Sequence, residues 1–314
     1  MDSSDESEFL STIQRKPIHI IAERTISSVA LLGGGQHFVS GDKNGKIRCW
    51  RTQDGVEVGI PIDAGSAVRC LATSQDGKWI AAGMESGQVS VWVAESQEEL
   101  RRFAKEKGPN SVDISSDGMK IAITWDGFVD VYSLPDGKML CGWKDYDYHT
   151  IKFSPDGRHF GYGAEKGNSS FLCIYEAQSG KSLGSSRITT RSIAWTSDSK
   201  RLFALSSDGD ISCIDPHSQA TLSKWPIHSN DNPTCISLSS NGAFIAASAN
   251  LSVSFWDTST HEQIGFVIYH PHSVNSMAIS PNYELVFAGD STIALWDLRN
   301  VLAAPYTSDQ VGGS

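Results

Sequence analysis

The chain has 314 residues, of which 39% are hydrophobic, and a formal net charge of -10. This charge argues against general binding to a nucleic-acid backbone, which requires clustered lysine and arginine. No apolar run reaches the ~18 residues of a membrane span. The acidic start of the chain does not resemble a signal peptide, so we expect a cytoplasmic protein, with the nucleus as the alternative compartment. The six cysteines stand singly, which favours free thiols over a zinc site or disulfides.

In chain order, residues 1–15 are acidic and rich in serine, which is typical of a mobile tail. A β-strand is predicted from Ile18 to Ile21, but no earlier segment can pair with it. We therefore expect it to pair with the far end of the chain and to close a ring. Residues 16–300 are interpreted as one domain, and residues 301–314 as a second flexible tail.

Between these tails, groups of short strands repeat with a period of about 41 residues. A large apolar residue ends the third strand of each unit, at Trp50, Trp92, Tyr132, Tyr175, Ile214, Trp256 and Trp296. A tight turn marked by Asp-Gly or Asn-Gly recurs in the same phase, as at Ser74 and Ser115. These two signals predict an all-β, seven-bladed β-propeller of four-stranded blades. The last unit lacks its own fourth strand, which the N-terminal strand is expected to supply.

The repeats resemble the WD40-repeat family over residues 17–300. In that family the third strand ends in Trp-Asp, an Asp stands six residues before the Trp, and a loop histidine precedes the first strand. The positions that carry the resemblance are structural: Trp50, Trp92, Asp126, Asp208, Trp256, Asp257, His270, Asp290, Trp296 and Asp297. The resemblance implies a buried hydrogen-bond network of His270, Asp290 and Trp296 in the last blade. It also implies a platform for other macromolecules.

No linear motif for catalysis is present in the sequence: there is no Gly-x-Ser-x-Gly, His-Glu-x-x-His or Walker pattern. The periodic positions of Asp126, Asp208 and Asp290 favour turn residues over catalytic carboxylates. We therefore expect no catalytic residue, no metal site and no cofactor. An enzyme with a site in the central channel is the remote alternative.

Function is expected in the loops at one face of the ring. The resemblance implies that binding residues lie in the loop before each first strand and just before the conserved Asp. Trp125 holds the second position, and Tyr146, Tyr148 and His149 lie in an aromatic segment suited to a protein interface. Packing between blades is the alternative explanation for each aromatic residue.

Two arginines and one longer unit complete the expectations for this face. Arg69 and Arg191 open other first strands and could add an anion contact at the mouth of the channel. The fourth unit is longer than the others, and its extra residues, 164–170, are expected to form a longer loop.

We interpret the chain as a non-catalytic scaffold or adaptor that binds a protein or peptide, as a monomeric propeller within a larger complex. We expect neither general nucleic-acid binding nor a membrane partner. The segment Trp296-Asp297-Leu298-Arg299 resembles the WDxR box of substrate receptors that dock on cullin-4 ubiquitin ligases. In this alternative, Arg299 would contact the ligase adaptor.

Overall fold

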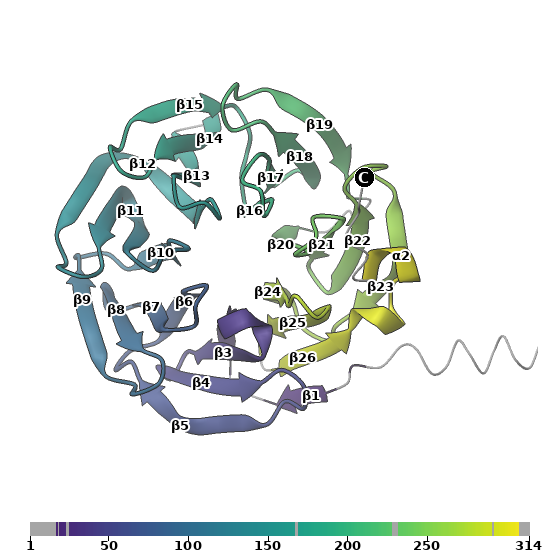
Figure 1. Ribbon diagram of the computed structural model, residues 1–314, viewed down its shortest axis with the longest axis horizontal. Helices are drawn as coiled ribbons and strands as arrows, with labels where there is room; N and C mark the ends of the chain where they lie inside the picture. The colour runs from purple at the N-terminus through teal and green to yellow at the C-terminus, as the bar shows by residue number, and fades with distance from the viewer. Residues whose placement is uncertain are drawn as a thin grey trace, which may run out of the picture.

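The computed structural model describes residues 17, 19–22, 25–166, 169–227, 232–290 and 292–307; it describes only the backbone of residues 19–22, 145–149, 166 and 305. The chain forms a closed ring of seven four-stranded blades around a central axis (Figure 1). Within each blade the strands are antiparallel and proceed from the channel outward. This arrangement confirms the fold predicted from the repeats.

Four blades are regular sheets whose strands follow chain order. Blade one contains β2(Ile26–Leu32), the 3-10 turn η1(Gly33–Gly35), β3(His37–Asp42), β4(Lys46–Arg51) and β5(Glu57–Asp63). Blade two contains β6(Val68–Thr73), β7(Trp79–Met84), β8(Gln88–Val93) and β9(Glu99–Ala104). Blade five contains β16(Ser192–Trp195), β17(Leu202–Leu205), β18(Asp210–Ile214) and β19(Thr221–Pro226). Blade six contains β20(Pro233–Leu238), β21(Phe244–Ala249), β22(Ser252–Asp257) and β23(Gln263–Tyr269).

Blades three and four are joined into one continuous sheet. Its elements are β10(Pro109–Ile114), β11(Lys120–Ser133), β12(Met139–Phe153), β13(His159–Lys166), β14(Ser169–Glu176) and β15(Ser182–Ser186). The first half of β11 pairs with β10 and its second half with β12, which then continues to pair with β13. The two blades are connected at Asp147, whose backbone is the partner of both Asp126 and Glu165.

The extra residues of the fourth unit extend this sheet instead of forming a longer loop. Glu165 is paired with Ser170, and Lys166 with Ser169, at the end of the β13–β14 hairpin. The expectation of a loop over residues 164–170 is therefore wrong. The added backbone groups pair with each other, which satisfies their hydrogen bonds.

Blade seven closes the ring. It consists of β24(Val274–Ile279), β25(Glu284–Gly289), β26(Thr292–Asp297) and, from the other end of the chain, β1(His19–Ala22). β1 runs antiparallel to β26, with His19 opposite Leu295 and Ala22 opposite Thr292. The predicted closure by an N-terminal strand is confirmed. It covers the edge that β26 would otherwise expose.

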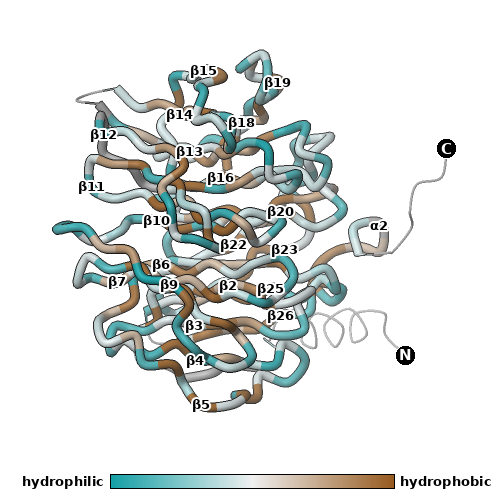
Figure 2. The backbone as a smooth tube through the Cα atoms, turned by 60° about the vertical axis from the view of Figure 1, so that its left-hand side comes forward, coloured by the Kyte–Doolittle hydropathy of each residue, from teal (hydrophilic) through white to brown (hydrophobic). Residues whose placement is uncertain are grey.

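The hydrophobic core lies between neighbouring blades. Among the described residues there are seven clusters of buried hydrophobic side chains, and each joins two adjacent blades. Figure 2 shows hydrophobic stretches along the strands and hydrophilic ones at many turns. Blades approach closely: a Cβ on Gly163 would lie only 2.8 Å from the carbonyl oxygen of Thr190. Small residues in the second strands therefore permit this packing.

Small hydroxyl side chains also link the inner strands from blade to blade. Each accepts a hydrogen bond from a backbone N–H of the following blade: Ser28 from Leu71 (3.2 Å), Ser111 from Ile151 (3.3 Å), Ser192 from Ile236 (3.2 Å) and Ser276 from Val29 (3.1 Å). The last of these bonds joins blade seven to blade one. These side chains satisfy N–H groups at the inner edge that no strand reaches.

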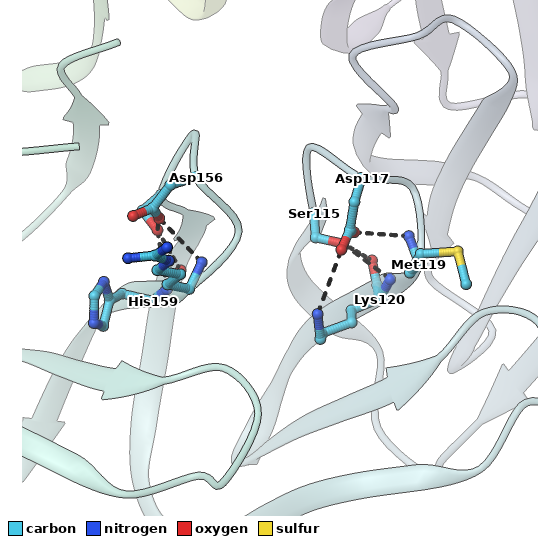
Figure 3. Close-up of polar contacts among 8 residues, drawn as sticks. Ser115, Asp117, Met119, Lys120, Asp156 and His159 are labelled. Atoms are coloured by element: carbon cyan, nitrogen blue, oxygen red, sulfur yellow. Dashed lines mark hydrogen bonds and ion pairs between the residues drawn. The ribbon is translucent and has the colours of Figure 1, made fainter. Parts of the chain in front are cut away.

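In blades two to six, the turn between the first and second strands is held by a Ser or Thr hydroxyl and by an Asp or Asn two residues later (Figure 3). Ser115 Oγ donates to Asp117 Oδ1 (2.5 Å) and accepts from the Lys120 N–H (2.9 Å). Asp117 Oδ1 also accepts from the Met119 N–H (2.9 Å). The same bonds recur at Ser74 and Asp76, Ser154 and Asp156, Thr196 and Asp198, and Ser239 and Asn241. They explain why the turn motif keeps both residues.

The segment after blade seven packs on the ring. Following the 3-10 turn η2(Leu298–Asn300), Val301 and Leu302 are buried (6% and 5% exposed), and α2(Ala304–Thr307) lies against blade six. Tyr306 OH donates to Asp257 Oδ2 (2.7 Å). A flexible tail from residue 301 is therefore wrong for residues 301–307; residues 308–314 lie outside the described part. Val301 and Leu302 pack on the ring because transfer of their apolar side chains out of water is favourable.

Lowering the pH from about 4 to about 2 is expected to weaken the fold through Asp257. Burial alone would raise the pKa of this carboxyl, but hydrogen bonds from Ser259, Thr260 and Tyr306 outweigh burial and lower the pKa to about 2. An unfolded Asp has a pKa of about 3.9. The stabilisation is therefore complete above pH ~4 and is lost as the pH falls through the folded pKa; it amounts to about 2 kcal/mol.

Urea unfolding at a series of pH values measures this effect. The free energy of unfolding of the wild type should fall more steeply with acid than that of Asp257→Asn. Identical pH dependence of the two proteins would contradict the assignment. Asp76→Asn is a useful comparison, because turn hydrogen bonds outweigh burial and lower the pKa of Asp76 as well.

Candidate partner-binding site

A groove of about 550 Å³ lies on the face that carries the loops between blades. It is formed by the connection from β9 to β10, the turn within β11 and the outer strand segment of β12. Its lining residues are Lys105, Glu106, Lys107, Trp125, Asp126, Gly127, Phe128 and Lys144. It therefore belongs to the loop and turn positions at which the sequence predicts binding.

Backbone geometry brings these segments together. The N–H of Lys105 donates to the carbonyl oxygen of Gly87 (2.9 Å), and a Cβ on Gly87 would collide with the carbonyl oxygen of Lys105. Glycine at this position therefore lets the chain leaving β9 lie against blade two. Gly127 has φ +82° and turns β11 back between Asp126 and Phe128.

Two lysines lie over the partly exposed ring of Phe128, and a third, Lys107, lines the same groove. Lys105 Nζ lies 4.0 Å from the centroid of this ring and 2.6 Å from Asp130 Oδ2 beneath it. Lys107 forms an ion pair with Asp126. Lys144 Nζ lies 5.4 Å from the same ring centroid and forms no ion pair with any acidic side chain that the structure describes. The groove thus combines an apolar surface with a cation that is available to a ligand.

Trp125 lies beneath this groove, not at an exposed surface. Its side chain is 0% exposed and belongs to the hydrophobic cluster between blades two and three. Its Nε1 has no hydrogen-bond partner among the described residues. The expectation that its ring is available to a partner is therefore wrong, because the ring points into the core between the blades, where its burial stabilises the fold.

The aromatic segment that follows Lys144 is defined only in its backbone. Tyr146, Tyr148 and His149 lie in β12, and their side chains are outside the described part of the structure. Their role in binding stays a prediction. Trp143 packs inside the sheet: its ring stacks on that of Tyr175 at 4.4 Å, and its Nε1 donates to Tyr162 OH (3.0 Å).

Arg69 and Arg191, which were both predicted to contact an anion at the mouth of the channel, lie in different blades. Arg69 is exposed at the start of β6, and a Cβ on Gly108 would lie 2.9 Å from its Nη1. Its guanidinium therefore lies beside the loop that carries Lys105 and Lys107. Arg191 is exposed just before β16 in blade five. Neither forms an ion pair with a described acidic residue, and only Arg69 adjoins the groove.

The hydrogen-bond network implied for blade seven is not formed. His270 is buried, and its Nε2 lies 2.6 Å from Thr292 Oγ1. Asp290 is exposed and accepts from Asn275 Nδ2 (3.3 Å), while Trp296 Nε1 is buried without a partner among the described residues. The expected network is wrong because the side chain of Asp290 faces solvent at the turn. The hydroxyl of Thr292, and not Asp290, forms the hydrogen bond with the His270 ring.

The tryptophans of the other blades keep their structural role. Trp50, Trp92 and Trp256 are 4%, 5% and 2% exposed. Trp50 Nε1 donates to Ser40 Oγ (2.8 Å), and Trp256 Nε1 to Ser254 Oγ (2.8 Å). A serine of the same sheet thus replaces the histidine and aspartate of the expected network.

The remaining aspartates occupy separate turns. Asp126 pairs with Lys107, Asp290 with Asn275, and Asp208 is exposed beside Gly209, whose N–H bonds to the Ser206 carbonyl. Within the described ranges, no three His, Cys, Asp or Glu residues are placed to hold a metal ion. No helix among the described residues is long and apolar enough to cross a membrane.

The central channel contains a cavity of about 380 Å³ lined by inner strands. Its acid and its base are paired with each other: Asp113 Oδ1 lies 2.9 Å from Lys152 Nζ. Asp113 Oδ2 accepts from the Phe153 N–H (2.8 Å). This carboxylate therefore links blades three and four. Burial raises the pKa of the Cys70 thiol, near the inner edge of blade two, to about 12, so it is protonated at neutral pH.

Arg299 lies on η2 with an exposed side chain. Its Nε and Nη2 donate to Asp297 Oδ1 and Oδ2, both at 2.8 Å. It lines a cavity of about 640 Å³ together with Arg51, His37, Glu284 and Thr307. This surface belongs to blades seven and one, away from the groove of blade three.

Four residues of the groove were not predicted as binding residues from the sequence: Lys105, Lys107, Phe128 and Lys144. One signal points to Phe128: it follows a turn glycine, at a position where other blades start the third strand with Lys46, Gln88 or Asp210. An aromatic residue at this normally polar position indicates a surface with a role in binding. The lysines carry no comparable signal, because surface lysines are common.

A family model described as WD domain, G-beta repeat matches residues 15–51, 61–93, 219–257 and 263–297. Over 78 residues the chain is 31% identical to Zinc finger CCCH domain-containing protein 17 of Oryza sativa subsp. japonica, covering 25% of this chain and 17% of that protein. Over 95 residues it is 32% identical to Protein ROOT INITIATION DEFECTIVE 3 of Arabidopsis thaliana, covering 29% and 22%. The chain thus matches less than a quarter of the length of these relatives.

Solved structures share the whole fold at low identity. Hydrazine synthase of Kuenenia stuttgartiensis superposes with a TM-score of 0.77 and 13% identity, covering 88% of this chain and 96% of that one. The β-propeller domain of Cps50 (Swd1) from Myceliophteria thermophila has a TM-score of 0.77 and 14% identity, covering 89% and 99%. At these identities the likeness shows the fold alone.

Seven four-stranded blades built from a repeating unit define a β-propeller repeat protein. Four of its segments match the family model of the WD40 repeat and lie in this closed ring, so the chain is a β-propeller protein with WD40 repeats. Propellers of this family generally act as non-catalytic scaffolds that bind protein partners.

Proposed function

We propose that this propeller is a non-catalytic scaffold that binds a protein or peptide across the loops of blades two to four. The observation that supports it is the groove around Phe128, where a partly exposed aromatic ring lies close to the ammonium groups of Lys105 and Lys144. Pockets that combine an apolar surface with a few charged groups are typical of binding sites. Tyr146, Tyr148 and His149 follow Lys144 directly in β12, so we include them in the same surface.

We further propose that the protein acts in the cytoplasm, with the nucleus as the alternative, as one propeller within a larger complex. The net charge of -10 makes a nucleic-acid backbone an unfavourable partner. The separated turn aspartates and the paired Asp113 support a non-catalytic role.

Affinity capture with tagged protein tests this function. Wild type is compared with Lys144→Glu and Tyr148→Ala in the proposed surface and with Arg299→Ala outside it. The chief partner should be lost with Lys144→Glu and weakened with Tyr148→Ala, and it should be retained by Arg299→Ala. Melting temperatures of all four proteins should agree, which excludes unfolding as the cause.

The ligase alternative makes the opposite prediction. It is favoured only by the exposed Arg299, whose guanidinium is engaged by Asp297. If Arg299→Ala removes a cullin-4 adaptor while both groove variants keep their partners, the substrate-receptor function replaces ours. Turnover of a small metabolite by the purified protein would instead favour an enzyme with its site in the central channel.

A further inference from the structure

We infer that the groove around Phe128 binds a short acidic segment of a partner protein, anchored by one apolar side chain. The inference rests on the proposed function and names the chemistry of its partner.

The described side chains around the groove leave an excess of positive charge. Lys105 is neutralised by Asp130, which is 2% exposed, and Lys107 by Asp126. Lys144, and Arg69 beside the loop of Lys105 and Lys107, have no acidic partner among the described side chains. Glu106 is the one lining acid for which no pairing is seen in the described part of the chain. In a chain of net charge -10, this local excess of cations favours an anionic ligand.

The ring of Phe128 supplies the apolar part of the site. Ammonium groups lie 4.0 Å and 5.4 Å from its centroid, so a lysine or arginine of a partner would meet like charges at the ring. An aliphatic or aromatic side chain can pack on the exposed part of the ring and on the lysine stems. The groove volume of about 550 Å³ holds one such side chain with its flanking backbone.

Neighbouring acidic residues of the same segment would then lie near Lys144 and Arg69. Each charge pair at the rim contributes modestly to affinity, and several together also give association rate and specificity. A weak, salt-sensitive interaction that requires both the anchor and the carboxylates is therefore expected. A ligand with only one of these features would bind poorly.

Fluorescence anisotropy with the purified full chain tests this chemistry. The probe is a fluorescein-labelled peptide of Asp and Glu residues around one central Phe. Three control peptides are compared with it. The first carries Asn and Gln in place of the acids, the second carries Lys in place of the acids, and the third carries Ala in place of Phe. A single-stranded DNA of similar length is the nucleic-acid probe. The acidic peptide with Phe should bind at least about tenfold more tightly than each control peptide and than the DNA.

Variants distinguish this groove from the general surface. Lys144→Gln and Arg69→Gln should each weaken binding of the acidic peptide about threefold or more. Glu106→Gln should strengthen it about twofold, because it removes the unpaired acid. The matched control is Lys200→Gln, an exposed lysine at a turn of blade five, which should leave affinity unchanged. Phe128→Ala should abolish the preference for Phe over Ala in the peptide.

Equal affinity for the acidic peptide and the control peptide with Asn and Gln would overturn the inference, as would tighter binding of the DNA or an equal loss with Lys200→Gln. These results would leave the proposed function intact if affinity capture still depends on Lys144. Capture that no groove variant changes would contradict the proposed function itself. The two experiments therefore fail separately.

Discussion

Deletion of residues 1–22 is expected to lower the free energy of unfolding by about 4 kcal/mol or more and to promote aggregation. The deletion removes β1, which pairs with β26 from His19 opposite Leu295 to Ala22 opposite Thr292. Without it, β26 becomes an open edge, and blades seven and one are held together by packing, by Ser276 and by the hydrogen bond from the Ile26 N–H to the Asp290 carbonyl oxygen (2.8 Å). Thermal unfolding followed by circular dichroism, with light scattering for aggregation, measures both effects.

Deletion of residues 1–12 is the matched control, because it shortens the chain and keeps β1. Its melting temperature should equal that of the full chain. If the two deletions melt together, closure by β1 contributes little and blade seven is stable with three strands.

Trp125→Ala is expected to cost about 3–5 kcal/mol of stability, the usual range for removing a large buried aromatic side chain. The ring is fully buried between blades two and three, against Val89, Val91 and Phe103. Its removal leaves a cavity that rigid neighbouring sheets cannot fill. The midpoint of urea unfolding should fall without a change in slope.

A surface aromatic residue provides the comparison. Tyr269 is 77% exposed at the outer edge of blade six, and Tyr269→Ala should change stability by less than about 0.5 kcal/mol. A similar small effect of Trp125→Ala would mean that its ring is at the surface after all. That result would restore the original prediction that Trp125 contacts a partner.

The fold was predictable because its signals are local and repeated. Turns such as Ser115-Ser116-Asp117-Gly118 form from bonds within a few residues, and the third-strand aromatics keep the same phase in each unit. Closure by β1 could be inferred because the N-terminal strand has no neighbouring segment to pair with and the last blade has only three strands of its own. Because the unit repeats seven times, the fold can be inferred even where single residues of the pattern are missing. Only two units, at Trp256 and Trp296, keep the Trp-Asp pair at the end of the third strand.

The candidate site was only partly predictable. The loop face and Arg69 stay predictions, whereas the Trp125 ring is buried between the blades and no sequence signal pointed to the lysines of the groove. A turn position specifies which face of the ring a residue approaches, but not whether its side chain points to solvent or between blades. That direction depends on the volume left by the neighbouring sheet, to which Val89, Val91 and Phe103 of blade two contribute.

The amino-acid sequence by itself determined the number of blades and the strand order within a blade, because both depend on short-range turn and strand patterns. It also determined how the ring closes, because the repeats leave one strand unpaired and the last blade one strand short. The tertiary structure alone decided which side chains meet across blades. It brought Lys105 and Lys144 to the ring of Phe128, buried Val301 and Leu302, and left His270 bonded to Thr292. Such contacts join residues of different strands and blades, and packing, not local propensity, sets their geometry.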